Sequence, residues 1–190
     1  MSYRDFFFTY RSYTPIPLIL AALILAETTP ASFICGFIIA IFGECLRIWA
    51  VRYAGSATRT TGTVGADDLV MTGPYGYVRN PLYLGNFLMS LGILLVAWPW
   101  MPWFLILFML LFAVQYTSII HLEEEFLAQN FSDRYRDYVQ NVPRFIPRIV
   151  SWDRGNRQPT GLRRALHTER NTLQSFSAVM VLLVLRWIIF

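Results

Sequence analysis

Lysine is absent from this chain, and all sixteen of its basic residues are arginine. Cysteine is scarce. The chain has only Cys35 and Cys45, and both lie in one apolar segment. On a helix these positions point about 80° apart and lie about 15 Å apart along the axis. They therefore cannot bridge each other, and they do not resemble a pair of metal ligands.

The short motifs of soluble cofactor-binding proteins are also missing. The chain has no Gly-x-Gly-x-x-Gly, no phosphate-binding loop ending in Gly-Lys-Ser/Thr, and no His-Glu-x-x-His sequence. Its two histidines are far apart in the sequence. These absences argue against a soluble nucleotide-binding domain, and no metal site is expected.

What the chain does have is apolar sequence. Hydrophobic residues make up 55% of it and charged residues only 15%, with a mean hydropathy of +0.43. A helix of about 20 apolar residues crosses a bilayer. We therefore expect an all-α integral membrane bundle of about five transmembrane helices, forming one domain over residues 1–190. The expected spans are residues 15–26 (short, and tilted or partly interfacial), 31–50, 81–98, 103–120 and 172–190. A soluble all-α protein with buried hairpins is the alternative.

The arginines predict an orientation for this bundle. Fourteen of the sixteen lie in segments that five spans and an inside N-terminus would place on one side. Arg59 is among them, and the short turns on the other side contain none. The positive-inside rule then puts the N-terminus, the 51–80 loop and the 122–171 segment in the cytoplasm. Any cofactor site built from those loops is expected to be cytoplasmic.

The sequence Arg79-Asn80-Pro81 predicts the start of a helix. Asn80 is a favourable N-cap residue, and Pro81 at the first helical position loses no hydrogen bond. Free N–H groups at such a helix start, next to Arg79, can bind a carboxylate or phosphate. Arg79 contacting only lipid headgroups is the alternative. Gly85 and Gly92 share a face of the same helix and would allow close packing of a neighbour.

A second polar group, His121-Leu-Glu-Glu-Glu, ends the fourth apolar stretch. We expect the helix to continue to Pro143, because apolar residues follow at helical spacing. Glu124 then faces this apolar stripe rather than open water, where a carboxylate is costly and often functional. It would accept hydrogen bonds from a ligand or pair with an arginine.

Two further polar features have simpler explanations. Glu44 and Arg47 are three residues apart near the end of a span, so they are expected to pair with each other. Asn86 and Ser90 form a polar patch that an interhelical hydrogen bond would explain. The arginine-rich 134–170 segment favours anionic lipid over nucleic acid as a partner.

Taken together, GPYGYVRNPLYLGNFL and EEEFLAQNFSDRYRDYVQNVPRFIP resemble the isoprenylcysteine carboxyl methyltransferase family and its relatives among the phospholipid methyltransferases. The family pattern is an Arg-His-Pro-x-Tyr-x-Gly helix start, followed about forty residues later by a Glu-Glu pair and a Phe-Gly…Tyr…Tyr…Val-Pro run. The resemblance covers roughly residues 44–148 and leaves the helix at 172–190 outside. Two residues depart from the pattern, because Asn80 replaces the histidine and Ser132 replaces the glycine.

This resemblance implies a membrane methyltransferase that uses S-adenosylmethionine and acts on a lipophilic acceptor or lipid. The acceptor would be an isoprenylcysteine-like carboxylate or a phospholipid-like amine. His121 and the glutamates are candidate bases if the acceptor must lose a proton, whereas Asn80 cannot titrate near neutral pH. Catalytic positions carried over are Arg79, Asn80 and Glu124. Cofactor-binding positions are Arg79, Asn80, Pro81, Tyr83, Gly85, His121, Glu123 and Glu124.

Two other functions remain open at this stage. Membrane sterol reductases share a similar Pro-x-Tyr-x-Gly segment and would bind a nicotinamide cofactor. A non-catalytic membrane scaffold would keep the same helices without the chemistry. The paired glutamates and the Val-Pro segment favour methyl transfer over both.

Overall fold

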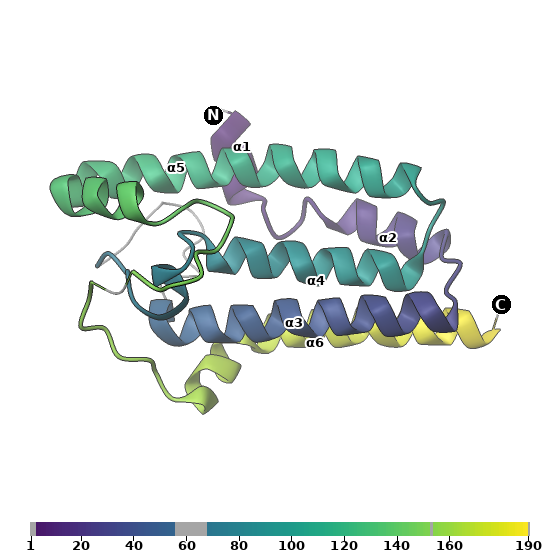
Figure 1. Cartoon of the computed structure of the whole chain (residues 1–190). Helices are drawn as coiled ribbons and strands as arrows, with labels where there is room; N and C mark the ends of the chain where they lie inside the picture. The colour runs from purple at the N-terminus through teal and green to yellow at the C-terminus, as the bar shows by residue number, and fades with distance from the viewer. Residues whose placement is uncertain (1–2, 56–67, 153, 190) are drawn as a thin grey trace.

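The computed structural model describes residues 3–55, 68–152 and 154–189, and within these ranges it contains helices and no strand. The all-α expectation is therefore confirmed, while Arg59 and Phe190 lie outside the described residues. The elements, labelled in Figure 1, are α1 (Tyr3–Thr9), α2 (Ile16–Ile24), α3 (Pro30–Ala54), the short 3-10 helix η2 (Gly73–Gly76), α4 (Pro81–Ala97), α5 (Trp103–Asn141) and α6 (Leu162–Ile189).

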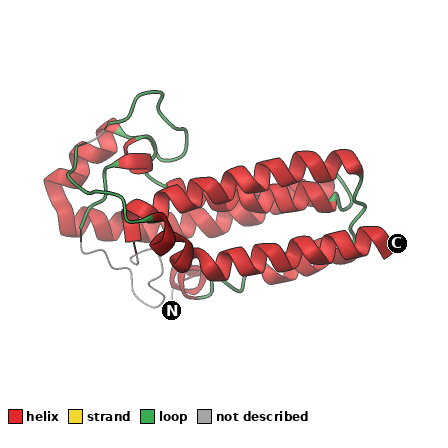
Figure 2. Ribbon diagram, turned by 90° about the horizontal axis from the view of Figure 1, so that it is seen from below, coloured by secondary structure: helices red, strands yellow, loops and turns green. Residues whose placement is uncertain are grey.

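The four long helices α3 to α6 lie side by side and alternate in direction (Figures 1 and 2). At one end of the bundle α3 ends and both α4 and α6 begin. We call this the polar end. Three helices, α3, α5 and α6, are long and apolar enough to cross a membrane. The apolar helix α4 has 17 residues and α2 only nine, so the expected count of five spans is not confirmed.

Helices α3 and α4 approach closely because glycines face one another. A Cβ added to Gly92 would lie 2.5 Å from the carbonyl oxygen of Gly36, and one added to Gly85 would lie 2.9 Å from that of Gly43. The expectation that Gly85 and Gly92 allow a neighbour to pack closely is confirmed. Small residues at such spacing permit van der Waals contact between backbones in a membrane, where the hydrophobic effect contributes little.

Apolar side chains form two separate cores. The larger lies between α2, α3, α4, α5 and α6 and includes Leu94, Phe108 and Met180. The smaller lies at the polar end, where Tyr135 and Tyr138 pack with residues from the 68–71 strip and from the α5–α6 connection. The apolar stripe expected to follow the glutamates therefore does pack, but against the loops of the polar end.

Helix α5 continues past the glutamates to Asn141, close to the predicted end at Pro143, but it is interrupted at Ser132, which the prediction did not include. Ser132 has φ 35° and ψ −107°, so the helix bends there, and its last turns leave the main axis (Figure 1). Such a conformation favours glycine, the residue that the family pattern has at this position. The bend turns the end of α5 back toward the start of α4.

Helix α6 begins ten residues before the apolar stretch from Thr172 that marked it in the sequence. Its first turns are polar, and they extend the bundle at the polar end. As a result Glu169, which belongs to the 122–171 segment expected outside the spans, lies on a helix that packs against α3.

Candidate functional site

A cavity of about 750 Å³ opens at the polar end and continues between the helices. Both sequence motifs contribute to its wall, since Arg79, Asn80, Pro81, Tyr83, Glu123 and Glu124 all line it. Its far side is apolar, with Ile16, Ile93 and Val179 from α2, α4 and α6. The cavity therefore joins a polar region to an apolar one within a single space.

The structure brings together most, but not all, of the predicted site residues. His121 and Gly85 do not line the cavity. Gly85 instead packs against Arg47 and Gly43 of α3, which is a role in helix packing. Six of the eight predicted cofactor-binding residues thus share one cavity.

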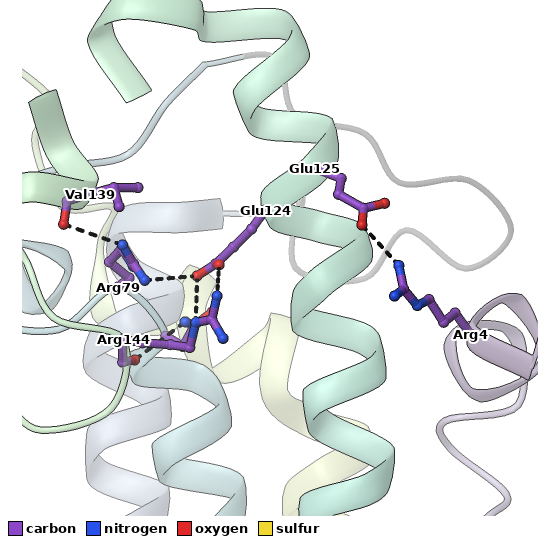
Figure 3. A network of polar contacts seen from close by, with 7 residues as sticks. Arg4, Arg79, Glu124, Glu125, Val139 and Arg144 are labelled. Atoms are coloured by element: carbon purple, nitrogen blue, oxygen red, sulfur yellow. Dashed lines mark hydrogen bonds and ion pairs between the residues drawn. The ribbon is translucent and has the colours of Figure 1, made fainter. Parts of the chain in front are cut away.

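The two motifs meet in an ion cluster, which we call the outer cluster: Arg79, Glu124 and Arg144 (Figure 3). Arg79 Nη2 lies 3.3 Å from Glu124 Oε1, and Arg144 Nε donates to the same oxygen at 3.2 Å. Arg144 Nη2 also donates to Glu124 Oε2. Glu124 therefore pairs with arginines, one of the two roles expected for it. Two guanidinium groups against one carboxylate leave the cluster with a formal charge of +1.

Asn80 occupies the N-cap position of α4, but its side chain does not cap the helix. Its Nδ2 donates instead to the carbonyl oxygen of Arg144, at 3.3 Å. The predicted side-chain cap is therefore wrong. The physical reason is that the Nδ2 bond holds the amide group against the α5–α6 connection, so Oδ1 does not accept from the first-turn N–H groups. Arg79 N also donates to Pro143 O of this connection, at 2.9 Å. The helix start keeps its first-turn N–H groups without a side-chain cap.

Deeper in the cavity, a row of aromatic and amide groups links α4 to α5. The Tyr83 hydroxyl donates to Glu123 Oε1 at 2.5 Å, and the Tyr83 and Tyr116 rings meet edge to face at 5.1 Å. Asn86 Nδ2 donates to the Tyr116 hydroxyl at 3.1 Å. The predicted interhelical hydrogen bond of Asn86 is therefore confirmed. Glu123 ends this row at the cavity wall.

A second charged group lies on the α3–α6 side, and we call it the inner pair: Arg47 and Glu169. Arg47 Nη2 lies 2.6 Å from Glu169 Oε2, with side chains only 12% and 1% exposed. The predicted Glu44–Arg47 pair is present but longer, at 3.6 Å. Arg47 Nη1 also donates to Asn86 Oδ1, so the inner pair connects to the amide row.

Several polar atoms at the cavity have no hydrogen-bond partner among the described residues. They include Tyr135 Oη and Arg79 Nε. Both atoms are buried, and both belong to residues that line the cavity. Burial raises the pKa of the Tyr75 hydroxyl, another group of the cavity wall, above its ordinary value. Buried donors and acceptors normally find partners. These atoms are therefore suited to a polar ligand.

Sequence reasoning missed Glu169, Tyr116 and Tyr75 as cavity residues. Glu169 gave one usable signal, because it lies three positions before an apolar span. Burying a carboxylate so close to the membrane costs free energy unless the carboxylate is paired. Tyr116 and Tyr75 gave none, because aromatic residues are common in membrane helices and at their ends. Only the packing of α4, α5 and α6 brings them to one cavity.

Comparisons with known proteins agree on one family. The family model of phospholipid methyltransferases matches residues 31–134. A protein-S-isoprenylcysteine O-methyltransferase of Schizosaccharomyces pombe is 31% identical over 126 residues, which is 65% of this chain and 50% of that protein. The enzyme of the same name from Saccharomyces cerevisiae is 32% identical over 119 residues, 61% of this chain and 49% of that protein.

A third relative is named for metal resistance rather than for methyl transfer. The nickel-cobalt-cadmium resistance protein NccN of Alcaligenes xylosoxydans xylosoxydans is 33% identical over 103 residues, 54% of this chain and 44% of that protein. The chain thus spans about half the length of the curated relatives that it matches, and no solved structure matches it. Because the family model covers more than half of the sequence and includes both the Arg79 motif and the glutamates, this chain belongs to the phospholipid methyltransferase family.

Proposed function

We propose that this protein is an integral membrane methyltransferase that uses S-adenosylmethionine to methylate a lipophilic acceptor. The observation that carries the proposal is the single cavity with a polar and an apolar part. A polar cofactor and a lipid-like acceptor would each find matching surroundings in it, with their reacting groups meeting between the two parts. Family membership supports methyl transfer and does not favour the reductase or scaffold alternatives.

The residues of the polar part fit S-adenosylmethionine. This cofactor carries a carboxylate, an ammonium group, ribose hydroxyls and a flat adenine ring. The outer cluster has a net positive charge next to an uncapped helix start, which suits the carboxylate. Tyr135 Oη and Arg79 Nε supply unused hydrogen-bonding groups. A volume of about 750 Å³ is within the range of sites for small ligands and leaves space for part of an acceptor.

When bound, S-adenosylmethionine supplies a methyl group already activated by a positive sulfur. The protein then needs to align the acceptor with that methyl group and to exclude water. A carboxylate acceptor is ionised at neutral pH and needs no base, whereas an amine acceptor must first lose a proton. Glu123, hydrogen-bonded to Tyr83 at the wall, is placed to accept one. Ile16, Ile93 and Val179 would hold the apolar part of the acceptor.

We further propose that the polar end faces the cytoplasm. The described arginines of the 68–80 and 134–170 segments lie at this end of the bundle, which agrees with the positive-inside rule. The cofactor would then enter from the aqueous side and the acceptor from the membrane.

Isothermal titration of the detergent-purified protein tests this function. We expect S-adenosylhomocysteine to bind and NADPH not to bind. Binding of NADPH alone would contradict methyl transfer and favour a reductase, and binding of neither would favour a scaffold. A transfer assay with radiolabelled S-adenosylmethionine then compares a prenylated cysteine with an ethanolamine phospholipid, and labelling of either identifies the acceptor class.

A further inference from the structure

The connection between α5 and α6 holds a rigidly docked stretch, residues 143–152. Arg79 N donates to Pro143 O, Arg148 N to Tyr77 O, and Trp152 N to Gly76 O, each at 2.9 Å. With the Asn80 side chain on the carbonyl of Arg144, four hydrogen bonds tie this stretch to residues 76–80. Its position relative to the start of α4 is therefore fixed by the backbone.

Four of the side chains between these bonds are large, apolar and exposed. Ile149 is 98% exposed and Ile146 80%, and Phe145 and Val150 are also exposed. Adjacent exposed apolar side chains are unfavourable in water, and a patch of them marks a contact surface. A flexible loop could turn them inward, but the docked backbone prevents this.

The position of the patch indicates what covers it. It is docked directly beside the start of α4, an apolar helix of the bundle, and at the end where α3 stops (Figure 1). Nearby, Trp49 of α3 is exposed and its ring lies 5.9 Å from that of Tyr77. Tryptophan and tyrosine gather at the boundary between headgroups and acyl chains. Further along α3, Ile38 and Phe42 are exposed as well, so an apolar outer face leads up to this boundary.

We propose that Phe145, Ile146, Ile149 and Val150 form a membrane-surface wedge that inserts into the bilayer boundary around the polar end. The partner is the lipid surface itself, which continues from the exposed faces of the spans. Arg148, between the apolar residues, bonds to the carbonyl of Asn141, and its long side chain can keep the guanidinium at the headgroup level. The exposed Arg154 lies just beyond the stretch and suits the phosphate layer.

The wedge has a consequence for the outer cluster. Arg144, which pairs with Glu124, directly precedes Phe145 in the same docked stretch. Insertion of the wedge would therefore hold Arg144 at a defined depth relative to the cavity. This inference concerns membrane contact alone and does not depend on the proposed enzymatic activity.

Depth-dependent fluorescence quenching tests the wedge. In a background with Cys35 and Cys45 replaced by serine, Ile149→Cys is labelled with bimane and reconstituted into vesicles of phosphatidylcholine and phosphatidylglycerol. Lipids with a doxyl group on the upper acyl chain serve as quenchers. We expect blue-shifted emission and quenching close to that of a Phe42→Cys control on the exposed face of α3.

The negative control is Asn130→Cys, which is exposed on α5 about 15 Å beyond Ile120 along the helix axis and should stay unquenched. Ile146→Cys provides a second reporter if the first variant does not fold. Quenching of both wedge reporters no greater than that of Asn130→Cys would overturn the proposal. Disulfide-linked dimers of the unlabelled Ile149→Cys variant, together with no quenching of the labelled variant, would show that a second copy covers the patch and would overturn the proposal equally.

Discussion

The outer cluster and the inner pair are both built from arginine and glutamate, but their surroundings differ. Glu169 of the inner pair is 1% exposed, whereas Glu124 of the outer cluster is 15% exposed and Arg144 33%. The inner pair joins α3 to α6 inside the bundle. The outer cluster joins the start of α4 to α5 and to the connection that follows it.

The two sites also differ in formal charge. The outer cluster has two arginines and one glutamate, while Arg47 has both Glu44 and Glu169 near it. A buried pair with excellent geometry mainly fixes the packing of its helices, because neither charge can be left alone in an apolar surrounding. A partly hydrated cluster with a surplus charge remains able to bind a ligand. We therefore propose that the inner pair, although it also lines the cavity, mainly holds α3 and α6 together, and that the outer cluster binds the ligand.

Breaking the inner pair should have the largest effect on stability. Glu169→Gln leaves the Arg47 guanidinium buried without its closest carboxylate. We expect a loss of about 3 kcal/mol, or a fall in melting temperature of roughly 6–12 °C for a chain of this size. The measurement is thermal unfolding of the detergent-purified protein.

The double variant Arg47→Met with Glu169→Met is the matched control for that prediction. It removes both charges and keeps the volume similar, so it should be more stable than Glu169→Gln alone. If the double variant is the less stable of the two, the pair is not the cause of the loss.

Glu124→Gln should have a smaller effect on stability and a clear effect on binding. Glutamine keeps one oxygen for the arginines, and water reaches the cluster, so we expect a loss of about 1 kcal/mol. Binding of S-adenosylhomocysteine should weaken because the arginines lose their fixed positions. The neighbouring Glu125→Gln is the control, since its pair with Arg4 is exposed and should change stability by less than about 0.5 kcal/mol. Equal affinities of the two variants would remove Glu124 from the binding site.

Tyr135→Phe should change binding without changing stability. The Tyr135 hydroxyl has no partner among the described residues, so nothing in the folded protein is lost with it. One neutral hydrogen bond to the cofactor corresponds to about 1 kcal/mol, or roughly a fivefold weaker affinity for S-adenosylhomocysteine in titration. Tyr13→Phe, at an exposed tyrosine, is the control and should bind normally. An unchanged affinity of Tyr135→Phe would place the cofactor elsewhere.

Ser132→Gly should give the smallest effect, a gain of stability of about 0.5–1 kcal/mol. The positive φ at this bend strains any residue with a Cβ, although glycine also makes the unfolded chain more flexible. Thermal unfolding measures the gain. Ser132→Ala should show none, and a glycine variant no more stable than the alanine variant would mean that the bend is unstrained. The bend matters for the outer cluster because it turns the end of α5, and with it the connection that carries Arg144, back toward the start of α4.

Much of the bundle could be predicted from the sequence, because local patterns determine it. The apolar runs fixed the positions of α3 to α6, and the spacing of Gly85 and Gly92 predicted a close neighbour. The same reasoning gave pairing with an arginine as one of two expected roles of Glu124. It misjudged Asn80, since capping is a local preference, whereas a tertiary hydrogen bond from Nδ2 to the carbonyl of Arg144 sets the orientation of this side chain. The bend at Ser132 had a signal in the family glycine, but a serine alone does not predict it.

The sequence by itself determined the class of this protein: a helical membrane protein with two polar motifs, resembling the methyltransferase family to which it belongs. These features depend on hydrophobicity and on residues near one another in the chain. Only the tertiary structure decided that Glu169 pairs with Arg47, that Tyr75, Tyr116 and Tyr135 face one cavity, and that the 143–152 stretch presents its apolar side chains outward. Those contacts join residues from different helices and loops, so their energies depend on the packing of the whole bundle, and no local pattern in the sequence names the partners.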